Sequence, residues 1–407
     1  MLSQRPSLTG SGVTLDALVR HAARAGWKQR VLCGVPASEA RTEVGGLGPD
    51  AIATVRFGEG ALPFAVPGMS DLMPYQSTRF SDLGEAELRA YREAWTEALR
   101  LEADANAPDV VHCHHVWLVS SLAKSALPGV PIVTHCHATG LRQMRLCPHL
   151  AAEVARGCAY NDRFVVLTAA HRDALCEAIG IEPARVTVVG AGFDEALFHG
   201  QGRLQTGEET LLYAGKLARS KGLPWLLDAV ERLARDRPNM VLEVAGGGSG
   251  EEAGELLARI RRMAPLVRYR GRLEQPKLAE LARSARLLVL PSLFEGLPLV
   301  VVEAAACGCR AVATRLPGIE AELSPTLGDA LIVVDPPRLL GPDEPAPSDL
   351  PRFVDDLTRA IERGLDMPPL TKPPPGLARF SWAAVFARVE RVWRELTTES
   401  SADSEYS

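Results

Sequence analysis

Lysine is scarce in this chain of 407 residues: of its 45 basic residues only six are lysines, at positions 28, 124, 216, 221, 277 and 372. The chain also lacks an excess of positive charge, because 50 acidic residues give it a net charge of −5. That balance argues against a nucleic-acid-binding protein. No apolar run approaches the ~20 residues that a membrane span needs, so we expect no spanning segment, and peripheral contact with a membrane is left open.

The eight cysteines are scattered and never form a C-x-x-C pair, and no secretory leader is evident. Both features favour reduced thiols and a cytoplasmic protein over a disulfide framework. The sequence also lacks a D-x-D motif in a suitable loop. We therefore expect no required divalent cation and no other cofactor.

What the chain does have is a globular composition, with 46% hydrophobic and 23% charged residues. Its length is that of two ordinary domains. In the second half, expected strands at 210–214, 241–245, 267–270 and 287–290 alternate with expected helices at 223–235, 251–264 and 276–285. This alternation predicts an α/β fold with a doubly wound parallel sheet.

The stretch Leu287–Thr314 has the pattern of a strand, a short loop and a helix. We expect Pro298 to be the first helical residue, because its fixed φ suits that position, and the free N–H groups there favour an anion. Glu295 lies in the loop, and Glu303 lies inside an otherwise apolar helix. A carboxylate on a packed face costs on the order of several kcal/mol unless it is paired. Glu303 therefore either follows a solvated edge or accepts hydrogen bonds from ligand hydroxyls.

Two of the six lysines, Lys216 and Lys221, lie five residues apart in the segment GKLARSKG, directly after an expected strand. The chain supplies most of its positive charge as arginine, so this clustering is informative. A compact ammonium beside a glycine turn suits a phosphate group. Two solvated lysines are the alternative interpretation.

Glu295-Gly-Leu-Pro and Glu303, eight residues apart, resemble the E-x7-E motif of retaining glycosyltransferases of family 4, which have the GT-B fold. The resemblance implies two Rossmann-like, doubly wound parallel-sheet domains facing an interdomain cleft. It implies a retaining, metal-independent transfer of a sugar from a nucleotide-diphosphate sugar to a hydroxyl of an unidentified acceptor. The implied acceptor-side domain covers residues 1–199, with a helix at 378–397 that packs back on it. The implied nucleotide-sugar-binding domain covers 200–377, and residues 398–407 are expected to form a disordered tail.

By this resemblance each matching residue has an implied role. Glu295 contacts the donor sugar, Glu303 holds the ribose, and Lys216 and Lys221 bind the diphosphate, although the family has arginine where Lys216 stands. The other implied donor-binding positions are Gly10, Gly12, Gly215, Gly246, Gly247, Arg270, Gly271, Gly296, Leu297, Pro298 and Leu299. Gly10 and Gly12 belong to SLTGSG, which we expect to be a flexible loop ahead of a helix at roughly 13–25, with a plain turn as the alternative.

Five of the nine histidines lie between positions 112 and 137, in DVVHCHH and IVTHCH, which we expect to be two strands. Histidine and cysteine are the ligands that zinc prefers. Alternation along a strand, however, puts His112 and His114 on one face and Cys113 and His115 on the other. Because this scatters the ligands, we expect no metal site.

The resemblance aligns His137 with a histidine that contacts the donor sugar near the reacting centre, and His135 is the alternative in register. The implied catalytic residues are then His137, Lys216, Lys221 and Glu295. Arg142 and Arg145 follow in an expected loop, where they either hold an anionic acceptor or face solvent.

Two other functions are compatible with the sequence. A nucleotide-sugar epimerase could use the same architecture, and a catalytically silent partner subunit could have kept the fold. An NAD oxidoreductase is disfavoured. The glycine-rich segment 246–250 is not followed, at the required distance, by a strand that ends in an acidic residue.

Overall fold

The computed structural model describes residues 5–6, 9–70, 73, 75–137, 139–203, 209–248, 250–341 and 344–404. The chain divides into two compact units, one of residues 1–191 with 382–407 and one of residues 192–381. Residues 199–203 belong to the second unit, and residues 204–208 lie outside the described ranges. Within those ranges no helix is both long and apolar enough to cross a bilayer.

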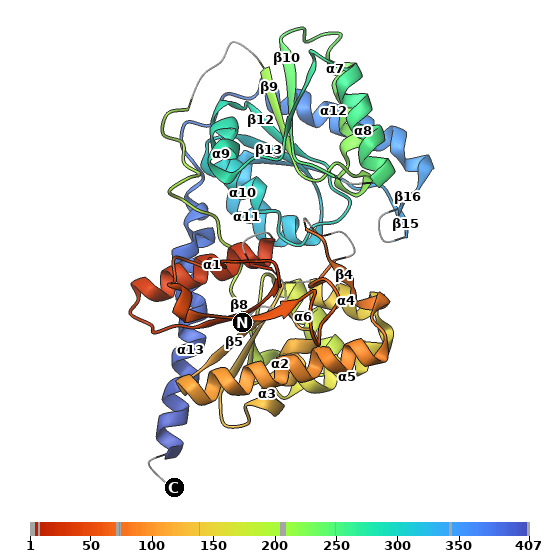
Figure 1. Ribbon diagram of the computed structural model, residues 1–407. Helices are drawn as coiled ribbons and strands as arrows, with labels where there is room; N and C mark the ends of the chain where they lie inside the picture. Colours follow the sequence, from red (N-terminus) through yellow and green to blue (C-terminus); the bar gives the residue numbers. More distant parts are fainter. Residues whose placement is uncertain are drawn as a thin grey trace. The chain divides into compact units, whose positions relative to one another are not determined.

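The second unit contains a six-stranded sheet with the order β11-β10-β9-β12-β13-β14, in which every pair of neighbours is parallel (Figure 1). The chain winds outward from β9 in both directions, so the prediction of a doubly wound parallel sheet is confirmed. The strands are β9 (Glu209–Ala214), β10 (Met240–Ala245), β11 (Val267–Gly271), β12 (Leu287–Leu290), β13 (Arg310–Thr314) and β14 (Leu331–Val334).

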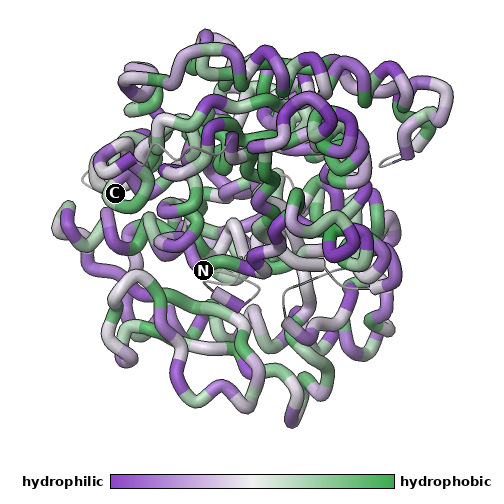
Figure 2. Tube along the Cα trace, turned by 90° about the horizontal axis from the view of Figure 1, so that it is seen from above, coloured by the Kyte–Doolittle hydropathy of each residue, from purple (hydrophilic) through white to green (hydrophobic). Residues whose placement is uncertain are grey.

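Helices cover both faces of this sheet. One face packs against α7 (Leu223–Leu233), α8 (Gly250–Arg262) and α12 (Leu350–Asp366), and the other packs against α9 (Gln275–Ser284) and α10 (Leu299–Ala306) (Figure 1). The central strands β10, β12 and β13 are buried along their whole length and are mostly apolar, whereas the edge strand β11 is partly exposed and carries Arg268 and Arg270. The outer helices instead alternate hydrophobic and hydrophilic residues along the trace (Figure 2).

Among its described residues the first unit contains three parallel sheets, of which the shortest pairs β3 (Pro67–Gly68) with β4 (Thr78–Arg79). β1 (Val31–Pro36) pairs with β2 (Ile52–Phe57). The larger sheet has the order β5-β6-β7-β8. Its strands are β5 (Val111–His114), β6 (Ile132–Cys136), β7 (Arg163–Val166) and β8 (Val186–Val188).

The helices of the first unit lie on opposite faces of this larger sheet. α2 (Glu85–Asn106), α3 (Leu118–Ala126) and α5 (Pro148–Ala159) share one hydrophobic core with it. On the other face, α1 (Gly10–Arg24) and α13 (Trp382–Ser404) enclose a second core with residues of β6 and β7 (Figure 1). α4 (Thr139–Leu146) follows β6, and α6 (Ala169–Ile179) follows β7.

Two expectations for the chain ends are wrong. Helix α1 begins at Gly10, so Gly10 and Gly12 lie in its first turn and not in a flexible loop. The cause is a side-chain cap, because the Thr9 hydroxyl accepts a hydrogen bond from the Gly12 N–H at 3.2 Å. At the other end, α13 continues to Ser404, so residues 398–404 are helical where a disordered tail was expected. Residues 7, 8 and 405–407 lie outside the described ranges.

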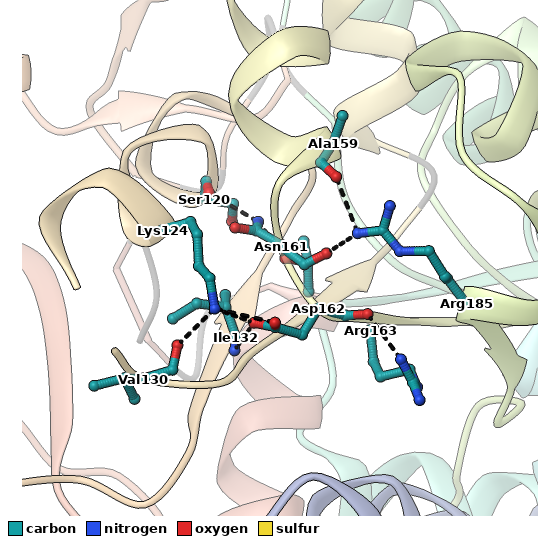
Figure 3. Close-up of polar contacts among 10 residues, drawn as sticks. Ser120, Lys124, Val130, Ile132, Ala159, Asn161, Asp162, Arg163 and Arg185 are labelled. Atoms are coloured by element: carbon teal, nitrogen blue, oxygen red, sulfur yellow. Dashed lines mark hydrogen bonds and ion pairs between the residues drawn. The ribbon is translucent and has the colours of Figure 1, made fainter. Parts of the chain in front are cut away.

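A polar network holds β6 against its neighbours (Figure 3). The Asp162 carboxylate accepts hydrogen bonds from the Ile132 N–H at 2.7 Å and from the Lys124 ammonium at 2.7 Å. The buried Asn161 amide donates to the Thr134 hydroxyl at 2.8 Å and to the Ser120 carbonyl at 2.9 Å. The network therefore fixes the start and middle of the strand whose end carries two histidines.

Candidate functional site

In the second unit, the loops that follow β9, β10 and β11 are joined by backbone hydrogen bonds. The Gly246 N–H donates to the Gly271 carbonyl at 2.7 Å, and the Leu217 N–H donates to the Gly247 carbonyl at 3.1 Å. Gly246 has φ +141°, and a Cβ atom there would lie 1.8 Å from the Gly215 carbonyl oxygen. Only glycine fits such an approach. The four predicted glycines of these loops therefore form one backbone-lined edge at the carboxyl ends of the strands.

Lys216 extends from this edge, and its backbone is held by a residue that sequence reasoning missed. The Tyr213 hydroxyl donates to the Lys216 carbonyl at 2.5 Å. Tyr213 is fully buried on β9, and burial, followed by the nearby Glu295 charge, raises the pKa of its phenol. The hydroxyl therefore keeps its proton and its donor role, while the Lys216 side chain is exposed.

Lys221 and Glu295 form an ion pair in which the ammonium nitrogen is 2.8 Å from Oε1. The Ser292 hydroxyl donates to the same carboxylate oxygen at 2.8 Å, and the Lys221 ammonium also donates to the Phe294 carbonyl at 3.2 Å. Ser292 is fully buried, whereas Lys221 and Glu295 are about one-fifth exposed. Two of the predicted catalytic residues are thus in direct contact.

The backbone brings this pair together by close packing of two loops. Gly222 has φ +73°, and a Cβ atom there would lie 1.9 Å from the Pro291 carbonyl oxygen. The Leu293 N–H donates to the Ser220 carbonyl at 2.9 Å. The loop after β9 and the loop after β12 therefore touch through their backbones.

Helix α10 begins one residue later than expected. Pro298 is its N-cap residue, with φ −76° and ψ 95°, and the helix starts at Leu299. The loop residues Gly296 and Leu297 precede the cap. The Gly296 carbonyl packs closely against Gly318, since a Cβ atom added at Gly318 would lie 2.0 Å from the Gly296 carbonyl oxygen. The predicted strand–loop–helix junction is confirmed, with its boundary moved by one position.

Glu303 lies inside α10 and is buried, so the interpretation of a solvated edge is wrong. Desolvation raises the pKa of its carboxyl to about 7. Burial is the cause of this shift, and among the described residues no positive charge is seen to offset it. A carboxyl in this state gains most from a ligand that brings its own hydroxyl donors.

The Arg270 side chain forms an ion pair with a residue of the neighbouring strand. Its guanidinium makes a bidentate contact with the buried Glu243 carboxylate, at 2.5 and 2.9 Å, and this contact raises the pKa of Arg270. The Arg270 side chain is therefore committed to Glu243. The backbone of residues 270–271 is therefore the part of this position that we expect to contact a ligand.

In the first unit, β5 and β6 bring four histidines into one row. The strand register pairs His114 with His135, and alternation places His112 and His137 on the same face as these two. The rings of His135 and His137 stack with centroids 4.1 Å apart, and His114 Nδ1 lies 2.9 Å from His137 Nε2. We call the residues His112, His114, His135 and His137 the histidine row.

The expectation that alternation scatters metal ligands is wrong for this row. That expectation treated each strand separately. Because β5 and β6 pair side by side, ring nitrogens of His114, His135 and His137 lie within 4.8 Å of one another. The rings of His114 and His137 are nearly parallel, with 9° between their planes, and a ring nitrogen of each takes part in a hydrogen bond between them. Tetrahedral chelation needs lone pairs that converge on one point, whereas these two nitrogens are used in a hydrogen bond to each other.

His115, whose ring centroid lies 5.0 Å from that of His137, ties the start of α1 to the first residue of α4. Its Nε2 lies 3.1 Å from the Ser11 hydroxyl, and its Nδ1 lies 3.1 Å from the Thr139 hydroxyl. The turn of α1 that contains Gly10 and Gly12 is thereby held near the end of β5. Arg142 and Arg145 lie on α4, not in a loop, and both are exposed.

The structure therefore gathers the predicted residues separately within each unit. The second unit brings together Lys216, Lys221, Glu295 and the glycine-lined loops, and the first unit brings together His137 and the start of α1. Tyr213, Ser292 and Glu243 were missed. Of these, Ser292 has a sequence signal, because it stands three residues before Glu295 in the same loop.

Family models match both halves of the chain. Residues 8–197 match the model described as Glycosyltransferase Family 4, and residues 208–339 match the model described as Glycosyl transferases group 1. The chain is 30% identical to a glycogen synthase of Mycobacterium tuberculosis over 301 residues, which cover 70% of this chain and 68% of that protein. It is 29% identical to D-inositol 3-phosphate glycosyltransferase 2 of Catenulispora acidiphila, over 82% of this chain and 83% of that protein.

Solved structures of similar fold cover nearly the whole chain. Sucrose-phosphate synthase from Thermosynechococcus elongatus matches with a TM-score of 0.71 and 18% identity, over 97% of this chain and 96% of that one. HepE from Anabaena, solved in complex with UDP and glucose, matches with a TM-score of 0.61 and 18% identity, over 96% and 98%.

Proposed function

This chain belongs to glycosyltransferase family 4 and has the GT-B fold, and from that premise we propose that it moves a sugar from a nucleotide-diphosphate sugar to a hydroxyl of an acceptor. We propose that the anomeric configuration is retained and that no divalent cation is required. The observation that carries the proposal is the Lys221–Glu295 ion pair at 2.8 Å, set beside the glycine-lined loops of the second unit.

The proposed chemistry follows from where charge develops. Breaking the bond between the sugar and the diphosphate builds negative charge on the leaving phosphate. The ammonium groups of Lys216 and Lys221 and the N–H groups at the start of α10 stabilise that charge, an effect typically worth about 3–4 kcal/mol per donor. Because fixed positive charges supply this stabilisation, the reaction needs no metal at the diphosphate.

The carboxyl groups of Glu295 and Glu303 accept hydrogen bonds from hydroxyl groups of the donor. The two donors that the described part of the chain supplies to Glu295 both bind Oε1, so Oε2 can accept a hydrogen bond from the transferred sugar. The buried Glu303 accepts from the ribose hydroxyls, and the backbone at Arg270 and Gly271 lodges the base. In the first unit, the uncharged histidine row, His137 included, binds further sugar hydroxyls, and the exposed Arg142 and Arg145 receive an anionic acceptor.

The first test is a thermal-shift screen of UDP-, GDP-, ADP- and TDP-sugars. A donor at about 100 times its dissociation constant should stabilise the protein by about 2.7 kcal/mol and raise the melting temperature accordingly. The Lys221→Ala variant should lose this shift, and the Lys277→Ala variant should keep it. If no nucleotide sugar raises the melting temperature of the wild-type protein, the proposal is wrong.

The second test identifies the reaction. The donor found in the screen is incubated with a glucan, an inositol phosphate and a sugar phosphate, which represent the acceptor chemistries named among the relatives. Proton NMR of the product should show the anomeric configuration of the donor, and EDTA should leave the rate unchanged. Conversion of the donor to another nucleotide sugar without any acceptor would indicate an epimerase instead.

All eight cysteines are free thiols, which supports our proposal that the reaction takes place in the cytoplasm.

A further inference from the structure

The loop after β12 presents one large apolar side chain to solvent. Phe294 is 51% exposed, whereas Leu293 and Leu297 of the same loop are buried. A single exposed hydrophobic residue is common on protein surfaces and needs no explanation by itself. Phe294 differs because it stands directly before Glu295, whose carboxylate is proposed to contact the donor sugar.

The backbone on both sides of Phe294 is fixed. Its own carbonyl accepts a hydrogen bond from the Lys221 ammonium at 3.2 Å. The Leu293 N–H donates to the Ser220 carbonyl at 2.9 Å, and Glu295 is held by the same ammonium at 2.8 Å. The ring cannot withdraw into the core by a shift of the loop without breaking these contacts. Phe294 is therefore a preformed apolar surface, and a ligand that covers it need not order the loop first.

The order of the strands indicates which part of a nucleotide sugar reaches this loop. The sheet runs β11-β10-β9-β12, and neighbouring strands lie about 4.8 Å apart, so the loop after β12 is roughly 14 Å from the loop after β11. The base is proposed to bind after β11, and the diphosphate at the two lysines after β9. Because β12 is the next strand beyond β9, the sugar that follows the diphosphate is the part that arrives beside Phe294.

A pyranose ring has two kinds of surface. Its hydroxyl groups project from the rim, and the C–H groups on its faces form an apolar patch. The carboxylate of Glu295 suits the rim hydroxyls, and the flat ring of Phe294 suits the C–H face, since the face of an aromatic ring is negative and attracts C–H hydrogens. A phosphate group would gain nothing from a phenylalanine side chain. The two neighbouring residues together therefore match a sugar.

We propose that Phe294 is a substrate-binding residue whose ring packs against the C–H face of a pyranose bound at the loop after β12. This inference rests on the proposed transfer of a sugar, and it adds an apolar contact to the proposed hydroxyl contacts. The pyranose belongs either to the donor or to the acceptor, and the chemistry of recognition is the same for both.

Three variants test the contact. Phe294→Ala removes the ring, and Phe294→Trp keeps a flat aromatic side chain. The matched control is Leu340→Ala, because Leu340 of β15 (Leu339–Gly341) is 60% exposed in the same unit but belongs to another segment. All three side chains are replaced at exposed positions, so the melting temperature should stay close to that of the wild type.

Isothermal titration measures the affinity for the UDP-, GDP-, ADP- or TDP-sugar that the thermal-shift screen selects, and for its nucleoside diphosphate alone. Initial rates give KM for the acceptor. If the ring binds the transferred sugar, Phe294→Ala should bind the nucleotide sugar about tenfold more weakly and the diphosphate as tightly as the wild type. If it binds the acceptor sugar, both affinities should stay unchanged and KM for the acceptor should rise about tenfold. In either case Phe294→Trp should stay close to the wild type, and Leu340→Ala should match it.

Two results would overturn the inference. One is a nucleotide-sugar affinity and an acceptor KM that are both unchanged in Phe294→Ala. The other is a weaker affinity of Phe294→Ala for the nucleoside diphosphate alone, because the ring would then support the loop of Lys221 and not a sugar. If the wild-type protein binds no nucleotide sugar, the proposed function fails and this inference fails with it. Unchanged variants of a protein that does transfer sugar refute the inference alone.

Discussion

The Lys221 ammonium and the Ser292 hydroxyl both bind Oε1 of Glu295, each at 2.8 Å. One carboxylate oxygen is thus fixed by two donors, and Oε2 has no hydrogen bond from a described residue. The arrangement orients the carboxylate and couples it to a positive charge. It also means that Lys221 serves two partners, because the same ammonium is proposed to contact the diphosphate.

Replacing Lys221 by alanine should reduce the rate of sugar transfer about 100- to 1,000-fold, the usual cost of removing one preorganised charge donor. The ion pair is partly exposed, and Ser292 still holds Glu295, so the melting temperature should change by only about 2 °C. Initial rates and thermal unfolding of the same preparation check both parts. The control is Lys277→Ala, which removes an exposed lysine paired with Glu280 at 3.0 Å in the same unit. Equal rates for the two variants would show that Lys221 has no role in transfer.

Replacing Ser292 by alanine tests whether the orientation of Glu295 matters. The variant loses one hydrogen bond to Oε1, and kcat should fall about tenfold because the carboxylate can rotate. Affinity for the nucleoside diphosphate without a sugar should stay unchanged, since the hydroxyl contacts no phosphate-binding group. Ser284→Ala is the control, because that hydroxyl donates only to the Leu281 carbonyl within its own helix. Isothermal titration with the diphosphate, together with kcat for transfer, separates these outcomes. A weaker diphosphate affinity would assign Ser292 to the phosphate site.

Sequence reasoning succeeded where the signal was local. The apolar run at Leu287–Leu290 and the loop and helix that follow it are specified by neighbouring residues. The alternation of strands and helices in the second half likewise depends on short-range periodicity. These elements place Lys221 and Glu295 at the same edge of a parallel sheet, because the carboxyl ends of its strands lie together.

Sequence reasoning failed where the structure depends on register or on a cap. The histidine row exists only because β5 pairs with β6 so that His114 stands beside His135, and strand pairing between distant segments leaves no local pattern. The start of α1 was misplaced because the two glycines suggested a loop. Thr9, which begins the helix, acts through one side-chain hydrogen bond. The hydrogen bond from the Trp393 indole to His112 was out of reach for the same reason, since the two residues lie 281 positions apart.

Replacing Gly246 by alanine should destabilise the second unit by about 3 kcal/mol. The residue has φ +141°, and the added Cβ would lie 1.8 Å from the Gly215 carbonyl oxygen. Donor binding should be lost with it, because the loops after β9 and β10 must separate. Denaturant unfolding and a nucleotide thermal-shift assay measure the two effects.

Replacing Gly254 by alanine, in the same unit, should stabilise the protein instead of destabilising it. Gly254 lies within α8, and a Cβ atom added at this position would have no neighbouring atom within 4 Å outside its own helix turn. The substitution should therefore stabilise the protein by about 0.5–1 kcal/mol through a lower entropy of the unfolded chain. If Gly246→Ala is as stable as Gly254→Ala, the close approach between the two loops does not exist in solution.

The titration of Glu303 should be visible in the stability of the protein. Its pKa is 4.5 in the unfolded chain and about 7 when folded, so between these values the folded state binds more protons than the unfolded state. The free energy of unfolding should therefore decrease as the pH rises from 4.5 to 7, by about 3 kcal/mol in total from this group. Histidines such as His135, whose pKa burial lowers to about 3, contribute the opposite slope over much of this range.

The measurement is therefore a difference between proteins. Urea unfolding of the wild type and of Glu303→Gln is compared at about pH 5 and about pH 8, on either side of the folded-state titration, and the wild type should lose more stability than the variant between them. Glu362→Gln, on an exposed position of α12, should behave like the wild type. A pH response of Glu303→Gln equal to that of the wild type would contradict the burial of an ionisable carboxyl at this position.

The same carboxyl links pH to donor binding. Hydrogen bonds from ribose hydroxyls stabilise the charged form, so a bound nucleotide should lower the pKa of Glu303 from about 7 and release a proton. Calorimetric titrations at about pH 6.5, where the free carboxyl is still largely protonated, should show this release for the wild type in two buffers of different ionisation enthalpy. They should show none for Glu303→Gln. Proton release that is equal in both proteins would assign it to another group, and the proposed contact between Glu303 and the ribose would then be wrong.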